Sequence, residues 1–197
     1  MRGATDYLGI DDGDFIRDDV PMTKKEIRIL TVAAARILAG YTVCDVGAGT
    51  GSLTVEAARQ AGDAGCVFAV EKNPVGAELI KKNAEKFNLG NIRIINAEAP
   101  EGLESLPPLD AAIIGGSGQN LPQIFAALDE KLKTGGRIVI NAITMQTLTE
   151  IFTVLKEYDG YKTETVSAQV NRLHKAGAHD MFLALNPVYI LTCEKRR

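Results

Sequence analysis

Three glycines at alternate positions, Gly47, Gly49 and Gly51, are the residues of this sequence best suited to bring backbone against a ligand. They follow a β-favouring apolar run, residues 42–46, and precede a helical pattern that begins near Leu53. Alternate glycines let the backbone adopt positive φ and remove the Cβ atoms that would hold a ligand away from the main chain. The first turn of the next helix offers unpaired N–H groups to a carboxylate or phosphate. The pattern therefore predicts a strand, a tight turn and a helix, with a small ligand across the turn.

The spacing of these glycines restricts the kind of ligand. Asp45 precedes a G-x-G-x-G run, which differs from the G-x-G-x-x-G of dinucleotide-binding turns and lacks the Gly-Lys-Ser/Thr of a phosphate-binding loop. We therefore expect neither a pyrophosphate nor a triphosphate here. The run from Asp45 to Gly51 resembles motif I of the Rossmann-like methyltransferases that use S-adenosyl-L-methionine. That resemblance implies that the turn passes along the methionine part of the cofactor. The plainer alternative is that the glycines serve only close strand–helix packing.

Two acidic residues follow the next two predicted strands. Glu71 comes directly after the second strand, where an acid in such folds accepts charge-assisted hydrogen bonds from ribose hydroxyls. Glu98 comes after the third strand, where this class of enzyme often places a polar side chain near the adenine amino group. Ala97 and Ala99 beside it are small enough for a flat ring. The alternatives are a solvated acid in a first helical turn for Glu71 and an ordinary surface residue for Glu98.

A glycine-rich segment, Gly115-Gly116-Ser117-Gly118, follows the fourth strand. In the methyltransferase class this place lies over the transferable methyl group. Enzymes that methylate adenine or amide nitrogens carry Asn/Asp-Pro-Pro-Tyr there, so its absence argues against a base or an amide as the acceptor. A glycine floor leaves room for a bulky, flat substrate, whereas a plain flexible turn is the alternative.

Histidines and other basic residues give a weaker signal. His174 and His179, the only histidines, are five apart in a polar segment, a poor spacing for a metal ligand set, and we expect no metal site. A solvated basic loop is the simplest interpretation of that segment. Two groups of basic residues are nevertheless candidates for contacts with a multiply anionic substrate. They are Arg172, His174 and Lys175 in the polar segment, and Lys24, Lys25 and Arg28 in the first helix.

Apolar runs and helical patterns alternate along most of the chain. The first helix is expected from a capping box at Thr23 and Glu26 to Gly40. Strands are expected at 42–46, 66–70, 92–95, 110–114 and 137–142, with a helix that opens with residues 53–58 and helices or helical pieces at 74–88, 98–106 and 121–132. Beyond them we expect a helix at 146–158, a strand at 161–169, a polar loop at 171–180 and a last strand at 181–193, broken by Asn186-Pro187.

This order of elements predicts the fold class. Continuous Val/Ile/Ala runs are typical of parallel strands that are covered on both faces. The last two strands have no helix between them and must be antiparallel neighbours. We therefore expect an α/β, Rossmann-like class I methyltransferase fold. Its sheet has seven strands, mostly parallel with an antiparallel C-terminal strand, and helices cover both faces.

Length and composition indicate one domain. The 197 residues are 46% hydrophobic, enough for a single α/β domain at residues 21–197 preceded by an N-terminal arm at residues 1–20. The net charge of −3 gives no sign of a broadly basic surface, so no nucleic-acid partner is expected. Three scattered cysteines suit buried thiols in a reducing compartment, and no signal or membrane-spanning segment is recognised. We expect a cytoplasmic protein with no membrane partner.

Several motifs together are similar to one family, the decarboxylating precorrin C15-methyltransferases of cobalamin biosynthesis. They are Val20-Pro21-Met22-Thr23, Asp45 to Gly51, Glu71-Lys72-Asn73-Pro74, Ala97-Glu98-Ala99-Pro100-Glu101 and Gly115 to Gly118. The resemblance implies S-adenosyl-L-methionine as cofactor, a tetrapyrrole (precorrin) substrate and a homo-tetramer. It also implies cofactor contacts, by Thr23, Gly47, Ala48, Gly49, Thr50, Gly51, Glu71 and Ala99. It names no catalytic residue. Ala48 stands where many members have cysteine, and Glu71 and Glu98 stand where aspartate is frequent.

Three other functions remain as alternatives. A methyltransferase of the same fold acting on tRNA or on protein carboxyl groups is the nearest, although a tRNA enzyme needs a basic face. A non-catalytic cofactor-binding protein would share the glycine turn. A short NAD oxidoreductase is disfavoured by the glycine spacing.

Overall fold

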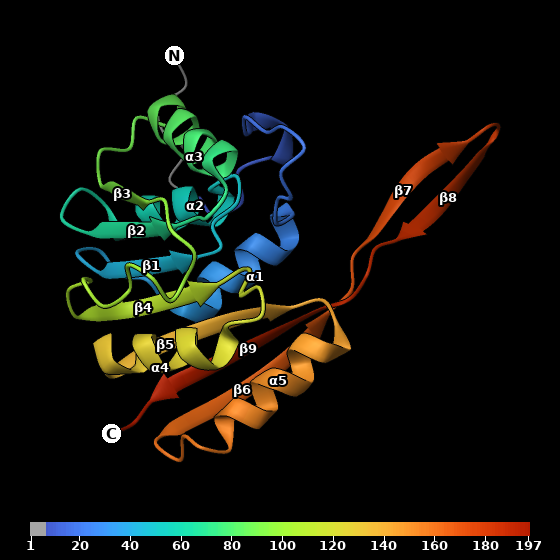
Figure 1. Cartoon of the computed structure of the whole chain (residues 1–197). Coiled ribbons are helices and arrows are strands. Elements are labelled where there is room, and N and C mark those ends of the chain that lie inside the picture. The colour runs from blue at the N-terminus through green and yellow to red at the C-terminus, as the bar shows by residue number, and fades with distance from the viewer. Residues whose placement is uncertain (1–6) are drawn as a thin grey trace.

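The computed structural model describes residues 7–197, so the first six residues of the expected arm lie outside the described part (Figure 1). One seven-stranded sheet has the strand order β3-β2-β1-β4-β5-β9-β6. Its strands are β1 (Thr42–Val46), β2 (Cys66–Val70), β3 (Ile92–Ile95), β4 (Leu109–Ile114), β5 (Leu132–Ala142), β6 (Tyr161–Ala168) and β9 (Val188–Lys195). The helices are α1 (Lys25–Ala35), α2 (Ser52–Ala61), α3 (Pro74–Lys86), α4 (Leu121–Lys131) and α5 (Met145–Leu155).

The strand directions confirm the predicted topology. β1 pairs in parallel with β2 and β4, and the parallel ladder continues through β3 and β5. β9 is antiparallel to both of its neighbours, β5 and β6. The chain moves outward from β1 to β3 and then resumes at β4 on the other side of β1. Ligands of open α/β sheets bind at such a switch point, beyond the carboxyl ends of the strands.

Apolar residues bury both faces of this sheet. Val43 on one face packs against α1 and α2, while Cys44 on the other belongs to the cluster that α4 and α5 cover. Cys44 and Cys193 are buried free thiols, and burial raises the pKa of both, to about 12 for Cys193, so they remain protonated packing groups.

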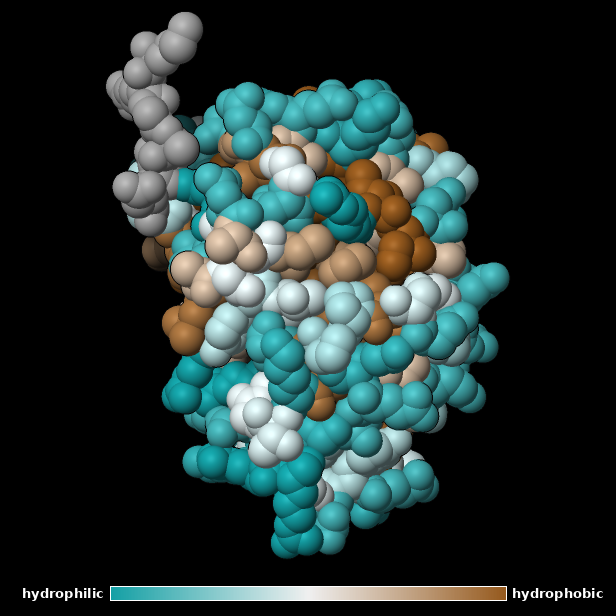
Figure 2. Space-filling view, turned by 90° about the vertical axis from the view of Figure 1, so that its left-hand side faces the viewer, coloured by the Kyte–Doolittle hydropathy of each residue, from teal (hydrophilic) through white to brown (hydrophobic). Residues whose placement is uncertain are grey.

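The parallel strands begin at the end of the molecule that lies opposite their carboxyl ends. The surface at this end carries mainly hydrophilic residues, with a hydrophobic band across its upper half (Figure 2).

The start and end of α1 differ from the prediction. Its N-cap is Lys24, with no side-chain cap, because the expected partner Glu26 turns to Arg172, whose Nη2 lies 2.6 Å from Glu26 Oε2. The helix ends at Ala35 rather than Gly40, since Arg36 adopts the left-handed conformation with φ 49°. The local pattern identified the helix, but one long-range ion pair and one backbone reversal determine its ends.

Two other segments also differ. Residues 99–105 form turns instead of the helical piece expected at 98–106, because Gly102 has a φ of +86°, which is outside the helical region. The expected turn before β5 is part of that strand, which already begins at Leu132 by pairing with Leu109.

The polar segment predicted as a loop is instead a β-hairpin. Its strands are β7 (Asn171–Ala176) and β8 (His179–Ala184), joined at Gly177, where φ is +64°. The predicted break at Asn186-Pro187 is present, since β8 ends before it and β9 begins after it. The hairpin projects from the body of the protein (Figure 1). Nothing in the described part of the chain covers it, so burial left no periodic pattern to read.

The described part of the arm packs against α2 and α3. It contains a short 3-10 helix, Asp12–Asp14, and its Ile10 and Phe15 form a small apolar cluster with Val55. Between residues 7 and 197, no helix has the length and apolarity needed to cross a membrane.

Candidate functional site

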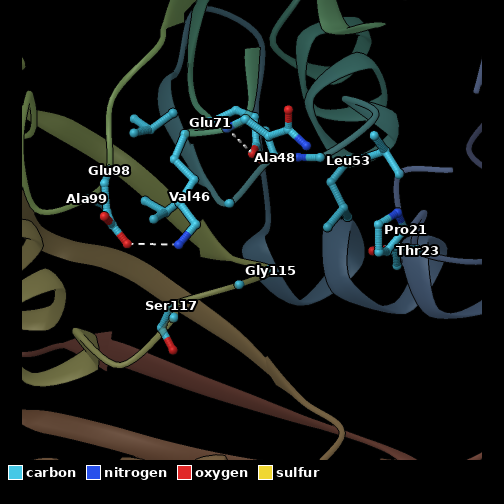
Figure 3. A pocket seen from close by; sticks show the side chains of 18 of the residues that line it. Pro21, Thr23, Val46, Ala48, Leu53, Glu71, Glu98, Ala99, Gly115 and Ser117 are labelled. Atoms are coloured by element: carbon cyan, nitrogen blue, oxygen red, sulfur yellow. Dashed lines mark hydrogen bonds and ion pairs between the residues drawn. The ribbon is translucent and has the colours of Figure 1, made fainter. Parts of the chain in front are cut away.

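A cavity of about 510 Å³ lies beyond the carboxyl ends of β1, β2 and β4. Five segments line it: Val20–Thr23, Val46–Gly49, Val70–Asn73, Ala97–Ala99 and Gly115–Gly118, with Leu53, Ile124 and Ile143. In Figure 3, Pro21 and Thr23 lie on one side, Glu98 and Ala99 on the other, and Gly115 and Ser117 below. The size is that of a site for a small organic molecule.

Of the eight predicted cofactor contacts, six line this cavity. They are Thr23, Gly47, Ala48, Gly49, Glu71 and Ala99. Thr50 and Gly51 are buried behind the turn and are not part of the wall. The topology thus brings together residues from four loops that are distant in sequence.

The glycine turn is held in a conformation that other residues rarely adopt. Gly47, Gly49 and Gly51 have φ angles of +69°, +57° and +77°. A Cβ on Gly47 would clash with the backbone of Gly116, and one on Gly49 would lie 3.0 Å from the carbonyl oxygen of Pro21. Gly51 packs against α3. Close packing therefore explains Gly51, while Gly47 and Gly49 allow two other loops to approach the turn.

Glu71 is a buried acid on the cavity wall, not a solvated one. Only 8% of it is exposed, its Oε2 accepts a hydrogen bond from Gly49 N at 2.7 Å and its Oε1 accepts one from Asn73 N at 2.8 Å. Each oxygen keeps a second acceptor site beside the cavity. This carboxylate therefore suits a ligand that carries two adjacent hydroxyl groups.

Gly76, which the sequence analysis passed over, makes room for this arrangement. A Cβ there would lie 2.8 Å from Glu71 Cγ and 3.0 Å from Gly49 O. The feature of the sequence that could have identified Gly76 is its place in the first turn of the helix that begins shortly after Glu71.

Glu98 is more exposed than Glu71 and is paired across the cavity wall. Its Oε1 lies 2.8 Å from Lys72 Nζ, and both side chains are more than half exposed (Figure 3). The hydrogen bond to Glu98 and its charge raise the pKa of Lys72, which stays protonated. Exposure makes this pair a weak and adjustable contact.

Behind the turn, Asp45 ties β1 to α2. Its Oδ2 accepts a hydrogen bond from Thr54 Oγ1 at 2.6 Å, while Oδ1 is buried and finds no partner in the described chain. Burial raises the pKa of Asp45, the Thr54 hydrogen bond opposes the rise and the Glu71 carboxylate adds to it, so that the pKa is about 6 instead of 3.8. Asp45 therefore fixes the turn without facing the cavity.

Arg28 does not meet a substrate, contrary to expectation, because it is fully buried. Its Nη1 donates to Thr23 O at 2.7 Å and pairs with Asp12 Oδ1 at 3.1 Å, while its Nε lies 3.4 Å from Glu56 Oε1. It therefore connects the arm, the Val20–Thr23 wall and α2. This burial could not be predicted from the local pattern, because the acidic partners of Arg28 lie far away along the chain.

The basic residues of the polar segment lie on the hairpin, away from the cavity wall. Arg172 pairs with Glu26, and His174 Nδ1 lies 3.1 Å from Met181 O. Residues 7–197 contain no group of three or more His, Cys, Asp or Glu placed to hold a metal ion.

The chemistry of the lining residues favours binding and alignment. The only titratable side chains among them are Glu71, Lys72 and Glu98, with no histidine or cysteine. Ser117 therefore has no base of the kind that activates a hydroxyl nucleophile. The site suits a reaction between two bound molecules that need to be brought together in a fixed orientation.

Comparison with known proteins places this site in a family. The precorrin methyltransferase domain profile matches residues 14–195. The probable cobalt-precorrin-6B C(15)-methyltransferase (decarboxylating) of Sulfurisphaera tokodaii is 43% identical over 189 residues, covering 95% of this chain and 97% of that protein. The precorrin-6y C5,15-methyltransferase structure from Geobacter metallireducens superimposes with a TM-score of 0.88 at 39% identity, covering 95% and 97% of the two chains.

A second solved structure agrees. The precorrin-8w decarboxylase of Methanobacterium thermoautotrophicum superimposes with a TM-score of 0.86 at 31% identity, covering 93% of this chain and 98% of that one. The strand order of the sheet and the glycine turn are those of a class I methyltransferase fold. Because the family profile matches nearly the whole chain, the protein belongs to the precorrin methyltransferase family.

Proposed function

We propose that the protein methylates C15 of a precorrin and removes the C12 acetate carboxyl group as carbon dioxide, in cobalamin biosynthesis. The observation that carries this proposal is the cavity at the switch point. It combines the glycine turn and Glu71 on one wall with a glycine floor on another, in a chain similar over 95% of its length to a protein named as a probable decarboxylating C(15)-methyltransferase. Transfer of label from methyl-labelled S-adenosyl-L-methionine to a precorrin tests it.

The residues present fit S-adenosyl-L-methionine as the cofactor. When bound, this cofactor supplies an electrophilic methyl group. Gly47 and Gly49 line the cavity and let the loops that contain Gly116 and Pro21 close around it, and Glu71 offers two free acceptor sites to ribose hydroxyls. Thr23, Ala48 and Ala99 complete the wall around it. Thr50 and Gly51 contribute by holding the turn from behind.

On the substrate side, the protein supplies a floor and an orientation. Gly115 and Gly116 have no side chains, so a flat ring can approach the end of β4. The lining contains no strong general base, which agrees with an acceptor carbon that is itself electron-rich. The protein then acts by holding two reactants in line and excluding water. No residue is assigned to proton delivery.

We also propose that the protein is a homo-oligomer, a tetramer by family resemblance, and that the β7–β8 hairpin contributes to assembly. Four large apolar side chains on it are more than half exposed: Leu173, Met181, Phe182 and Leu183. Such a surface favours burial against another chain. Light scattering is expected to show a smaller species for Phe182→Asp than for the wild type. An unchanged mass would remove the hairpin from the assembly.

The remaining proposals concern organisation and location. Residues 21–197 are proposed as the catalytic domain and residues 1–20 as an arm. The free, buried thiols Cys44 and Cys193 support a cytoplasmic location. The slightly acidic chain supports no nucleic-acid partner, and a tRNA or protein carboxyl methyltransferase is not favoured. Detecting the protein in the separated fractions of broken cells would test the cytoplasmic location.

A further inference from the structure

We propose that Ile143 and Met145 form an apolar shelf that binds one face of the flat tetrapyrrole substrate. This inference rests on the proposed function. Both side chains are large, apolar and exposed, at 60% and 62%. Ile143 lines the cavity, and Met145 follows two residues later. An exposed apolar side chain that lines a cavity, as Ile143 does, is suited to a ligand that brings apolar area of its own, and Met145 adds a second exposed apolar side chain close by along the chain.

The position of the shelf follows from the sheet. β5 lies beside β4, with Ile140 opposite Ile114, so the segments that leave the two strands are neighbours. The segment after β4 is the glycine floor, Gly115–Gly118, and the one after β5 begins with Ile143. The shelf therefore continues the floor at the carboxyl edge of the sheet.

The backbone of the shelf is fixed by a helix cap. Thr144 is the N-cap of α5, and its Oγ1 accepts a hydrogen bond from Thr147 N at 3.1 Å. Met145 is the first residue of that helix. Ile143 and Met145 thus extend from either side of a capped helix start, which limits the conformational entropy lost when a ligand binds.

The chemistry of the two side chains points to a broad apolar ring face. Neither carries a charge or a hydrogen-bonding group for a phosphate or sugar. The thioether of Met145 is polarizable and flexible, and adapts to the face of a conjugated ring. In the neighbouring floor, Gly115 and Gly116 have no side chain that would tilt such a ring. A reduced tetrapyrrole, apolar on its faces and anionic at its rim, has this shape.

Two polar substitutions, Ile143→Asn and Met145→Gln, test the shelf in the full-length protein. Each is expected to raise KM for the precorrin by about tenfold, with kcat and the affinity for S-adenosylhomocysteine unchanged. Ile143→Leu, which keeps an apolar side chain at this position, is expected to raise KM less than Ile143→Asn. Phe152→Gln is the matched control, since Phe152 is 47% exposed on α5 but is absent from the cavity wall.

The outcomes separate the shelf from the proposed function. An unchanged KM for the precorrin in both polar variants would overturn the shelf. If the oligomeric mass of these variants also changed, Ile143 and Met145 would belong to a subunit contact instead. Absence of methyl transfer by the wild type would instead overturn the proposed function. In that case the shelf can still be tested by measuring the affinity for the tetrapyrrole through fluorescence quenching. Equal affinity in the wild type and the polar variants would contradict the shelf.

Discussion

The guanidinium group of Arg28 donates a 2.7 Å hydrogen bond to the carbonyl oxygen of Thr23, although Arg28 is completely buried. Thr23 lines the cavity, whereas Arg28 lies behind the wall. A buried charge is tolerated only with partners, and Asp12 and Glu56 provide them. The cavity wall and the fold of the arm therefore depend on the same side chain.

Replacing Arg28 by Met is expected to destabilise the protein by about 3–5 kcal/mol, because Glu56 would keep a buried charge without its partner. Urea unfolding measures this loss. Arg93→Met is the control, with a change within about 0.5 kcal/mol, since Arg93 is exposed and bonds only to nearby carbonyls. Equal stability of the two variants would show that the buried network is not needed.

Gly47→Ala is expected to cost more stability than Gly40→Ala. Both positions have positive φ, +69° and +85°, so both variants carry a backbone strain of about 1–2 kcal/mol. Only at Gly47 does the new Cβ meet another backbone, that of Gly116, whereas at Gly40 nothing lies within 4 Å. We expect a further ~2 kcal/mol at Gly47 by thermal or urea unfolding. Equal losses of stability in the two variants would mean that the loops of Gly47 and Gly116 can move apart at no cost in free energy.

Glu71→Ala is expected to weaken S-adenosylhomocysteine binding by about 10- to 100-fold, because two charge-assisted acceptors are lost. Calorimetry on the folded variant provides the measurement. Glu71→Gln keeps one acceptor and should lie between the wild type and Glu71→Ala. Glu101→Ala, at an exposed acid outside the cavity wall, is expected to bind like the wild type. Wild-type affinity in Glu71→Ala would remove the acid from the cofactor site.

Asp45 predicts a pH dependence of stability. Its folded pKa of about 6 exceeds the ordinary 3.8, so the folded state binds the proton more tightly than the unfolded chain. The free energy of unfolding therefore falls as pH rises through that interval and is regained on acidification. From about pH 7 to about pH 5, the wild type should gain about 1 kcal/mol relative to Asp45→Asn. Parallel pH profiles for the two proteins would contradict this.

The sequence predicts the sheet better than the hairpin, for a physical reason. β1, β2 and β4 lie where continuous apolar runs were found, since strands buried on both faces leave that local signal. β7 and β8 bury neither face within the described chain and leave no such signal. The break at Asn186-Pro187 was readable because proline and asparagine act locally.

For the site, local sequence identified the residues whose role depends on their own loop. The glycine turn and Glu71 were found in this way, and both lie on the cavity wall. Arg28 was misjudged as a surface cation and Gly76 was missed, because both are defined by contacts with segments distant in sequence. Such pairings are set by the fold and cannot be read from a single helix.

The proposed reaction is tested most directly by the mass of the product formed from a decarboxylation-competent precorrin and S-adenosyl-L-methionine. This product is expected to have gained one methyl group and lost one carbon dioxide. Glu71→Ala is expected to form it more slowly at low cofactor concentration. An unchanged substrate mass, in a preparation where an active family member gives the product, would rule out C15 methylation with decarboxylation by this protein.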